Sequence, residues 1–144
     1  MPIKNLVPAI AFNGTCAEAI RRYTRALGAE VQHLVHFRDG AKMGHAFDDK
    51  EADLVLNASL RLGAGQIMVM DAPPGRRVPD ESNLQVAVEF SDDAMVEKAC
   101  TALAEGGAVI MAPHDSFWGA RFAMVRDAFG VGWMLSHTKT PVKA

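Results

Sequence analysis

The stretch Phe117–Ser136 reads FWGARFAMVRDAFGVGWMLS and says most about the fold. Its first part alternates polar and apolar residues, which is typical of a strand with one buried face. Gly130 and Gly132 supply the permissive backbone that a tight reversal needs, and an apolar second strand follows them. The stretch therefore predicts a two-stranded hairpin whose aromatic and arginine side chains line a surface or a cavity.

The residues before this hairpin predict a strand, a helix and a further strand. Residues 84–90, LQVAVEF, alternate as a half-buried strand does. Asp92 or Ser91 has the side chain to cap a helix, and a glycine pair beginning at Gly106 ends it. Residues 108–112 then predict another strand, so this half of the chain has the order βαβββ.

The first half of the chain predicts the same order. Its expected elements are a strand at 6–12, a helix from Thr15 to Gly28, a strand at 30–37, a loop at 38–53, and strands at 54–62 and 66–70. Thr15 and Glu18 have the spacing of a capping box at the helix start. In the strand at 54–62, alternation puts Leu56 on the buried face together with Ala58 and Leu60.

The two halves correspond residue by residue at their landmarks. Phe12 and Phe90 each end a first strand, Gly28 and Gly106 each end the following helix, and each pair lies 78 residues apart. The predicted fold is therefore α+β, with two βαβββ modules whose curved mixed sheets form a cavity and are each covered by one helix. Within a single domain of residues 1–144 we expect module one at about 3–71, a linker at 72–83 and module two at about 84–138.

The composition excludes several classes of partner. The net charge is −2 and no lysine/arginine block occurs, so nucleic acid and anionic membranes are poor partners. No apolar run approaches the ~20 residues that span a bilayer, and no basic stretch with an apolar core opens the chain. Cys16 and Cys100 belong to no CxxC pair and are expected as buried thiols in helices. We therefore expect a cytoplasmic protein.

Six stretches, which together cover nearly the whole chain, carry a family resemblance. They are Phe12-Asn13-Gly14, Cys16–Tyr23, Leu27–Glu30, Met68–Gly75, Phe117–Arg121 and Asp127–Gly130. In this order they resemble the vicinal-oxygen-chelate superfamily, which includes glyoxalase I, ring-cleaving dioxygenases and bleomycin-resistance proteins, and within it the PhnB-like proteins. The resemblance implies paired βαβββ modules, usually in a homodimer, with a cavity formed by the sheets; it does not settle a reaction.

The sequence departs from that superfamily at the positions where its enzymes bind a metal. They typically hold a divalent metal with His, Glu or Gln on the cavity strands, and PhnB-like proteins often have a histidine where this chain has Asn57. Gln85 and Glu89 are donors on one strand only, and no pair of histidines has metal-binding spacing with a third ligand nearby. We expect no bound metal and no other cofactor, with a divalent metal as the alternative, and no catalytic residue is assigned.

The polar and aromatic residues expected in the cavity predict a ligand site. They are Asn57, Arg61, Gln85, Glu89, Trp118 and Arg121. Arg121 can hold a carboxylate or phosphate through two hydrogen bonds; the alternative is an ion pair with Asp115, Asp127 or Glu89.

Three function classes remain open at this point. The first is a PhnB-like protein that binds a small molecule, anionic compounds included, and forms a homodimer. The second is a metal-dependent lyase, isomerase or dioxygenase of the same superfamily, so that enzymatic activity is undecided. The third is a pure interaction module.

Overall fold

The computed structural model describes residues 2–43 and 49–139. Its elements are β1 (Ala9–Phe12), α1 (Cys16–Leu27), β2 (Glu30–His36), the 3-10 helix η1 (Phe37–Met43), β3 (Val55–Leu62), β4 (Gly65–Asp71), β5 (Gln85–Glu89), α2 (Asp93–Ala104), β6 (Ala108–Asp115), β7 (Ala120–Arg126) and β8 (Gly132–Thr138). Close contacts divide the chain into two units, Met1–Val78 and Pro79–Ala144, which are described separately. In the described part, no helix is long and apolar enough to span a membrane.

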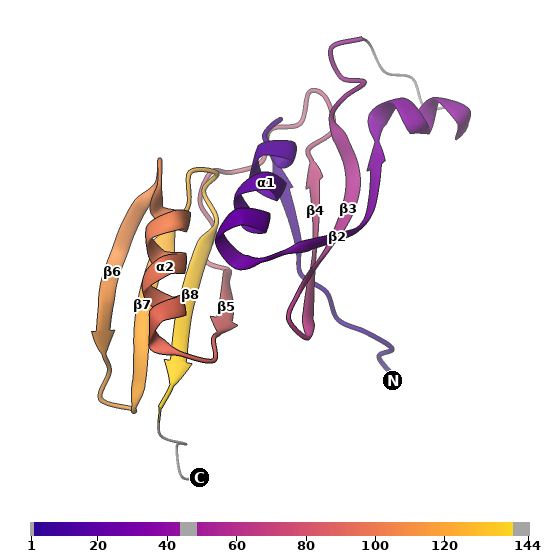
Figure 1. Ribbon diagram of the computed structural model, residues 1–144. Coiled ribbons are helices and arrows are strands. Elements are labelled where there is room, and N and C mark those ends of the chain that lie inside the picture. Colours follow the sequence, from indigo (N-terminus) through magenta and orange to yellow (C-terminus); the bar gives the residue numbers. More distant parts are fainter. Residues whose placement is uncertain (1, 44–48, 140–144) are drawn as a thin grey trace. The chain divides into compact units, whose positions relative to one another are not determined.

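Each unit is one four-stranded mixed sheet with one α-helix, and the first unit also contains η1. The strand order is β1-β4-β3-β2 in the first unit and β5-β8-β7-β6 in the second. In both, the first strand pairs in parallel with the last, and the remaining pairs are antiparallel. Figure 1 shows the order β5-β8-β7-β6 of the second unit, with every strand of that sheet labelled. The predicted α+β class with two βαβββ modules is confirmed.

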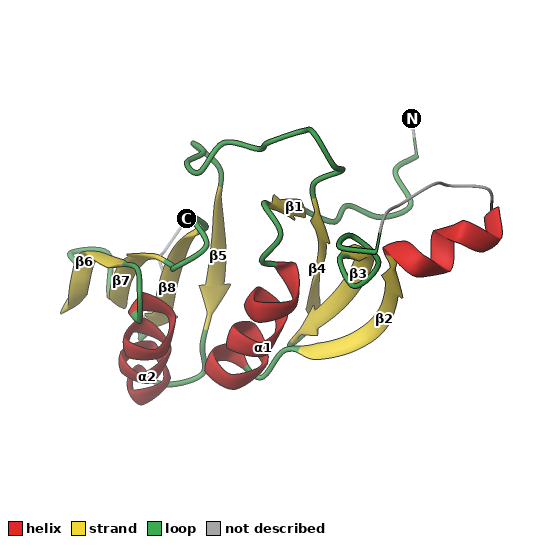
Figure 2. Ribbon diagram, turned by 90° about the horizontal axis from the view of Figure 1, so that it is seen from above, coloured by secondary structure: helices red, strands yellow, loops and turns green. Residues whose placement is uncertain are grey.

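Each helix buries one apolar stripe against its own sheet. In the second unit the buried residues of α2 are Val96, Ala99, Cys100 and Leu103, as the spacing of the apolar residues predicts. Seen from above, α2 lies on one side of β6, β7 and β8 and leaves the other side without a helix (Figure 2).

Burial raises the pKa of the Cys16 thiol to about 12, with the Asp71 carboxylate adding to the effect. Both cysteines are buried free thiols, as expected.

A buried carboxylate, Asp71, fixes the start of α1. Its two oxygens accept hydrogen bonds from the backbone N–H groups of Cys16, at 3.0 Å, and Val55, at 2.9 Å. The expected capping box at Thr15 does not form, because the Thr15 side chain makes no cap hydrogen bond. A residue at the end of β4 therefore satisfies the helix end, and a negative charge near a helix N-terminus is stabilising.

A second buried carboxylate, Asp127, organises the β7–β8 turn. One oxygen accepts the N–H groups of Phe129 and Val131 at 2.9 and 3.0 Å, and the other accepts the indole N–H of Trp133 at 2.9 Å. Trp133 has no exposed surface. The turn is thus tied directly to the largest side chain of the core, and an aspartate that accepts backbone N–H groups of the residues after it is a common turn cap.

Two further local expectations are wrong. Leu56 is 42% exposed, while its neighbour Val55 is fully buried, because the β2–β3 ladder shifts register between Val35 and His36 and alternation breaks there. Residues 37–43 form η1 where a loop was expected from residue 38 onward. The loop expected over 44–48 lies outside the described residues.

Asp127→Asn is expected to lower the free energy of unfolding by about 1–3 kcal/mol, because the amide group puts a donor against buried N–H groups. Urea unfolding measures this loss. The matched control is Asp49→Asn at an exposed position, which should change stability by no more than about 0.5 kcal/mol. Equal unfolding midpoints for the two variants would contradict the assigned role of Asp127.

Candidate functional site

The face of the second sheet opposite α2 carries Gln85 and Glu89. Side chains alternate along a strand, and Ala123 and Val125 of β7 are buried on the α2 side. The register then places one set of side chains on the other side, which we call the open face: Gln85, Ala87, Glu89, Ala108, Met111, His114, Ala120, Phe122, Met124, Arg126, Met134, Ser136 and Thr138.

Aromatic rings gather at the end of the open face where β6 turns into β7. Phe117, Trp118, Phe122 and His114 form a chain of edge-to-face contacts, with ring centroids 5.1, 5.3 and 6.0 Å apart. Phe122 is buried within this aromatic cluster, whereas Trp118 is 41% and Phe117 97% exposed. The cluster therefore leaves aromatic surface exposed at this end of the open face.

The other end of the open face is polar and hollowed. A hollow of about 60 Å³ is lined by Ser82, Gln85, Ile110, Met124, Val125, Arg126, Gly130 and Gly132. A side chain at Gly132 would approach the Gln85 side chain to 3.2 Å, and one at Gly130 would meet the Asp80 carbonyl. The two glycines therefore let the segment before β5 pack closely beside the β7–β8 turn. We call this feature the polar hollow.

Glu89 lies on the open face with its carboxylate already hydrogen-bonded. It accepts the Ser136 hydroxyl at 2.9 Å and the Thr138 N–H at 2.5 Å. Partial burial alone would raise the pKa of Glu89, but these hydrogen bonds and nearby His137 outweigh it and hold the pKa below its ordinary value. Glu89 is therefore an ionised group that contributes negative charge to the open face.

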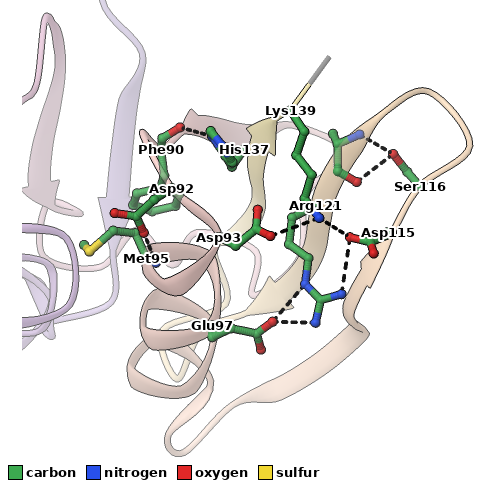
Figure 3. Close-up of polar contacts among 11 residues, drawn as sticks. Phe90, Asp92, Asp93, Met95, Glu97, Asp115, Ser116, Arg121, His137 and Lys139 are labelled. Carbon is green, nitrogen blue, oxygen red and sulfur yellow. Dashed lines mark hydrogen bonds and ion pairs between the residues drawn. The ribbon is translucent and has the colours of Figure 1, made fainter.

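Arg121 lies on the α2 side of the sheet. Its Nε and Nη2 donate to one oxygen of Glu97 at 2.9 and 2.6 Å, and Nη1 donates to Asp115 at 3.5 Å (Figure 3). Lys139 bonds Asp115 and Asp93 at 2.8 and 3.0 Å. Hydrogen bonding to Glu97 is the main cause that raises the pKa of Arg121. The predicted Asp115 pair is present, but the principal partner, Glu97, was not foreseen.

The structure brings together only some of the predicted site residues. Gln85 and Glu89 share the open face, and the Trp118 ring packs on it. Arg121 points to the other side of the same sheet, and its guanidinium is occupied by acids. Asn57 and Arg61 belong to β3 of the first unit; the exposed Arg61 pairs with Glu30 across the β2–β3 ladder, and Asn57 is half-buried. Their ligand-binding roles stay predictions.

Arg126 is a candidate site residue that the sequence analysis did not select. It shares the open face and the polar hollow with Gln85. Arg121 and Arg126 are five residues apart on one strand, so they must face opposite sides. The spacing predicts that the two arginines lie on opposite faces. It does not predict which arginine lies on the helix side, because both faces of β7 are largely apolar.

The donor groups of the described chain do not fit a metal site. In the described ranges 2–43 and 49–139, no three His, Cys, Asp or Glu side chains come together in a group able to hold a metal ion. On β4, Met68 and Met70 lie on the face opposite the buried residues of that strand, and Met134 occupies the equivalent position on β8. Thioethers do not favour the hard divalent cations that carboxylates bind.

Arg121→Gln is expected to lower the thermal midpoint modestly, because it removes the link between α2 and the β6–β7 hairpin. The loss should shrink with added salt. The loss should also shrink in acid. Hydrogen bonding from Lys139 is the main cause that holds the pKa of Asp115 below its ordinary value, and the charge of Arg121 adds to it. The Arg121–Asp115 pair therefore stabilises the fold at neutral pH, and this contribution is lost as the pH falls through the pKa of Asp115.

A double-mutant cycle with Glu97→Gln separates the ion pair from packing effects. The double variant should lose less stability than the two single variants lose together, because both remove one interaction. Strict additivity would contradict the pairing described above.

Comparisons with known proteins agree with this fold. The family model of the Glyoxalase/Bleomycin resistance protein/Dioxygenase superfamily matches residues 6–135. Protein YjdN of Escherichia coli (strain K12) is 29% identical over 144 residues, covering 93% of this chain and 95% of its own length.

Solved structures are similar over nearly the whole chain. Protein PA1353 from Pseudomonas aeruginosa superposes with a TM-score of 0.84 at 30% identity, covering 96% of this chain and 100% of that chain. A Bacillus cereus protein described as a putative 3-demethylubiquinone-9 3-methyltransferase, PhnB protein, has a TM-score of 0.76 at 18% identity, covering 93% and 99%, and shares the fold. The resemblance seen in the motifs is confirmed. The chain belongs to the glyoxalase/bleomycin resistance protein/dioxygenase superfamily.

Proposed function

We propose that the protein binds a small molecule, anionic compounds included, against the open face of the second sheet. The observation that carries this proposal is the half-exposed Trp118 ring, which rests edge-on against the buried Phe122 ring at 5.3 Å. A tryptophan held in this way offers a flat apolar surface at low entropic cost. Planar apolar groups are the natural occupants of such a surface.

The surroundings of Trp118 support a binding role over a purely structural one. Trp133, the other tryptophan, is fully buried and bonded to Asp127, as a packing tryptophan should be. Trp118 has no such buried partner for its indole N–H among the described contacts, and Phe117 beside it is almost fully exposed. Exposed aromatic surface next to polar groups commonly marks an interaction site.

The family supports a small molecule as the class of ligand. The name of the family joins a resistance protein for a small compound with enzymes that act on small molecules. A homodimer is part of the same proposal, because Val109, Ile110 and Met111 of the edge strand β6 are exposed and need cover.

The metal-dependent enzyme is the second candidate and rests on the family alone. The proposal therefore expects no stoichiometric zinc, nickel or iron after purification without a metal-binding tag. Elemental analysis that finds about one metal ion per chain would favour the metal-dependent enzyme over the binding protein.

Trp118→Ala is expected to weaken the binding of planar probes such as 2-naphthol and 2-naphthoate by about tenfold, because the stacking surface is lost. Isothermal titration measures the affinity without using tryptophan as the reporter. Trp118→Phe should retain most of the affinity, and Val31→Ala, which changes an exposed apolar residue of β2 in the first unit, serves as the control. Equal affinities for Trp118→Ala and the unmodified protein would remove the proposal.

A further inference from the structure

We propose that the polar hollow holds the anionic group of the ligand, with Arg126 as the main contact of that group. The anionic group takes the place of Glu81 as the partner of Arg126. This inference rests on the proposed function, since it assumes that the ligand's ring lies on the aromatic cluster. It adds the second point of contact and thereby the class of ligand: an aromatic acid whose ring and acidic group are separated by a linker.

The strand geometry sets the distance between the two contact points. Phe122, Met124 and Arg126 occupy alternate positions of β7 and therefore share the open face. At about 3.3 Å per residue, the four-residue step from Phe122 to Arg126 covers roughly 13 Å. Met124 lies between them and provides a flexible apolar side chain. The surface thus runs from aromatic rings through a thioether to a guanidinium.

The ion pair of Arg126 is of the kind that a ligand can replace. The described residues give Arg126 one ion pair, from Nη1 to an oxygen of Glu81 at 2.6 Å. Both side chains are exposed, 40% for Arg126 and 70% for Glu81, and exposed pairs of this kind contribute little to stability. A carboxylate or another planar anion can instead bond two guanidinium N–H groups at once.

Arg121 differs from Arg126 in the number of hydrogen bonds that its guanidinium makes to acidic side chains. Its guanidinium donates through three nitrogens to Glu97 and Asp115, on the side of the sheet that α2 covers. Arg126 lies beside a hollow that the missing side chain of Gly132 helps to keep open, and the Gln85 side chain borders the same space. An amide and a guanidinium at one small hollow supply hydrogen-bond donors for an acidic group.

The test uses ω-phenylalkanoic acids, from phenylacetate to 8-phenyloctanoate, and their uncharged primary amides. Acids long enough to reach the hollow should bind about fivefold more tightly than their amides, as one net charge-assisted contact at a partly exposed site allows. Short acids should show no preference over their amides. Ligand-observed NMR titration measures both series on the full chain.

Variants then assign the preference to named residues. Arg126→Gln should abolish the preference for acids and leave amide binding unchanged, while Arg126→Lys should keep part of it because the charge remains. Glu81→Gln should tighten the binding of the long acids by removing the competing carboxylate. Arg38→Gln is the matched control, because Arg38 is also an exposed arginine with one acidic partner, Asp53. Far-ultraviolet circular dichroism checks that each variant is folded.

The possible results separate the two proposals. Acids and amides that bind equally at every length, or a preference that survives Arg126→Gln, would overturn the role of the polar hollow while leaving ring binding at Trp118 intact. Binding of both series that does not depend on Trp118 would instead remove the proposed function, and this inference with it.

Discussion

One helix against four strands is the constraint on which the rest of each unit depends. A 12-residue helix covers one face of its sheet, and α2 buries four residues there. The opposite face receives no helix from its own unit, so its side chains must face a partner, a ligand or water. In the second unit that face combines an aromatic cluster with a polar hollow, and this is the combination expected of a binding surface.

Two buried carboxylates hold the frame that positions this surface. Asp71 joins the start of α1 to its sheet, and Asp127 joins the β7–β8 turn to Trp133. Because Arg126 directly precedes Asp127, the turn that Asp127 fixes also determines where the guanidinium of Arg126 lies. A rigid turn beside a flexible charged side chain gives the hollow a defined wall and an adaptable contact. The stability of the core and the geometry of the candidate site are therefore connected through this turn.

Local patterns in the sequence predicted most of the fold, and long-range contacts account for what they missed. Alternation and glycine positions located the strands and both helices, because these signals lie within a few residues of each element. The cap of α1 comes from Asp71, 55 residues from Cys16, which no local motif reveals. The bulge at Leu56 depends on strand pairing, which no local pattern shows. The side of β7 that faces α2 also depends on strand pairing, so the sequence did not distinguish Arg126 on the open face from Arg121 on the helix side.

Chemical-shift mapping tests most directly whether ligands bind the open face of the second sheet. Adding 8-phenyloctanoate to the ¹⁵N-labelled chain should move the indole N–H signal of Trp118 and the backbone N–H signals of Met124 and Gly132. The indole signal of Trp133 should stay nearly fixed, because it is bonded to Asp127 in the core. Shifts confined to α2 or to the first unit would contradict the account.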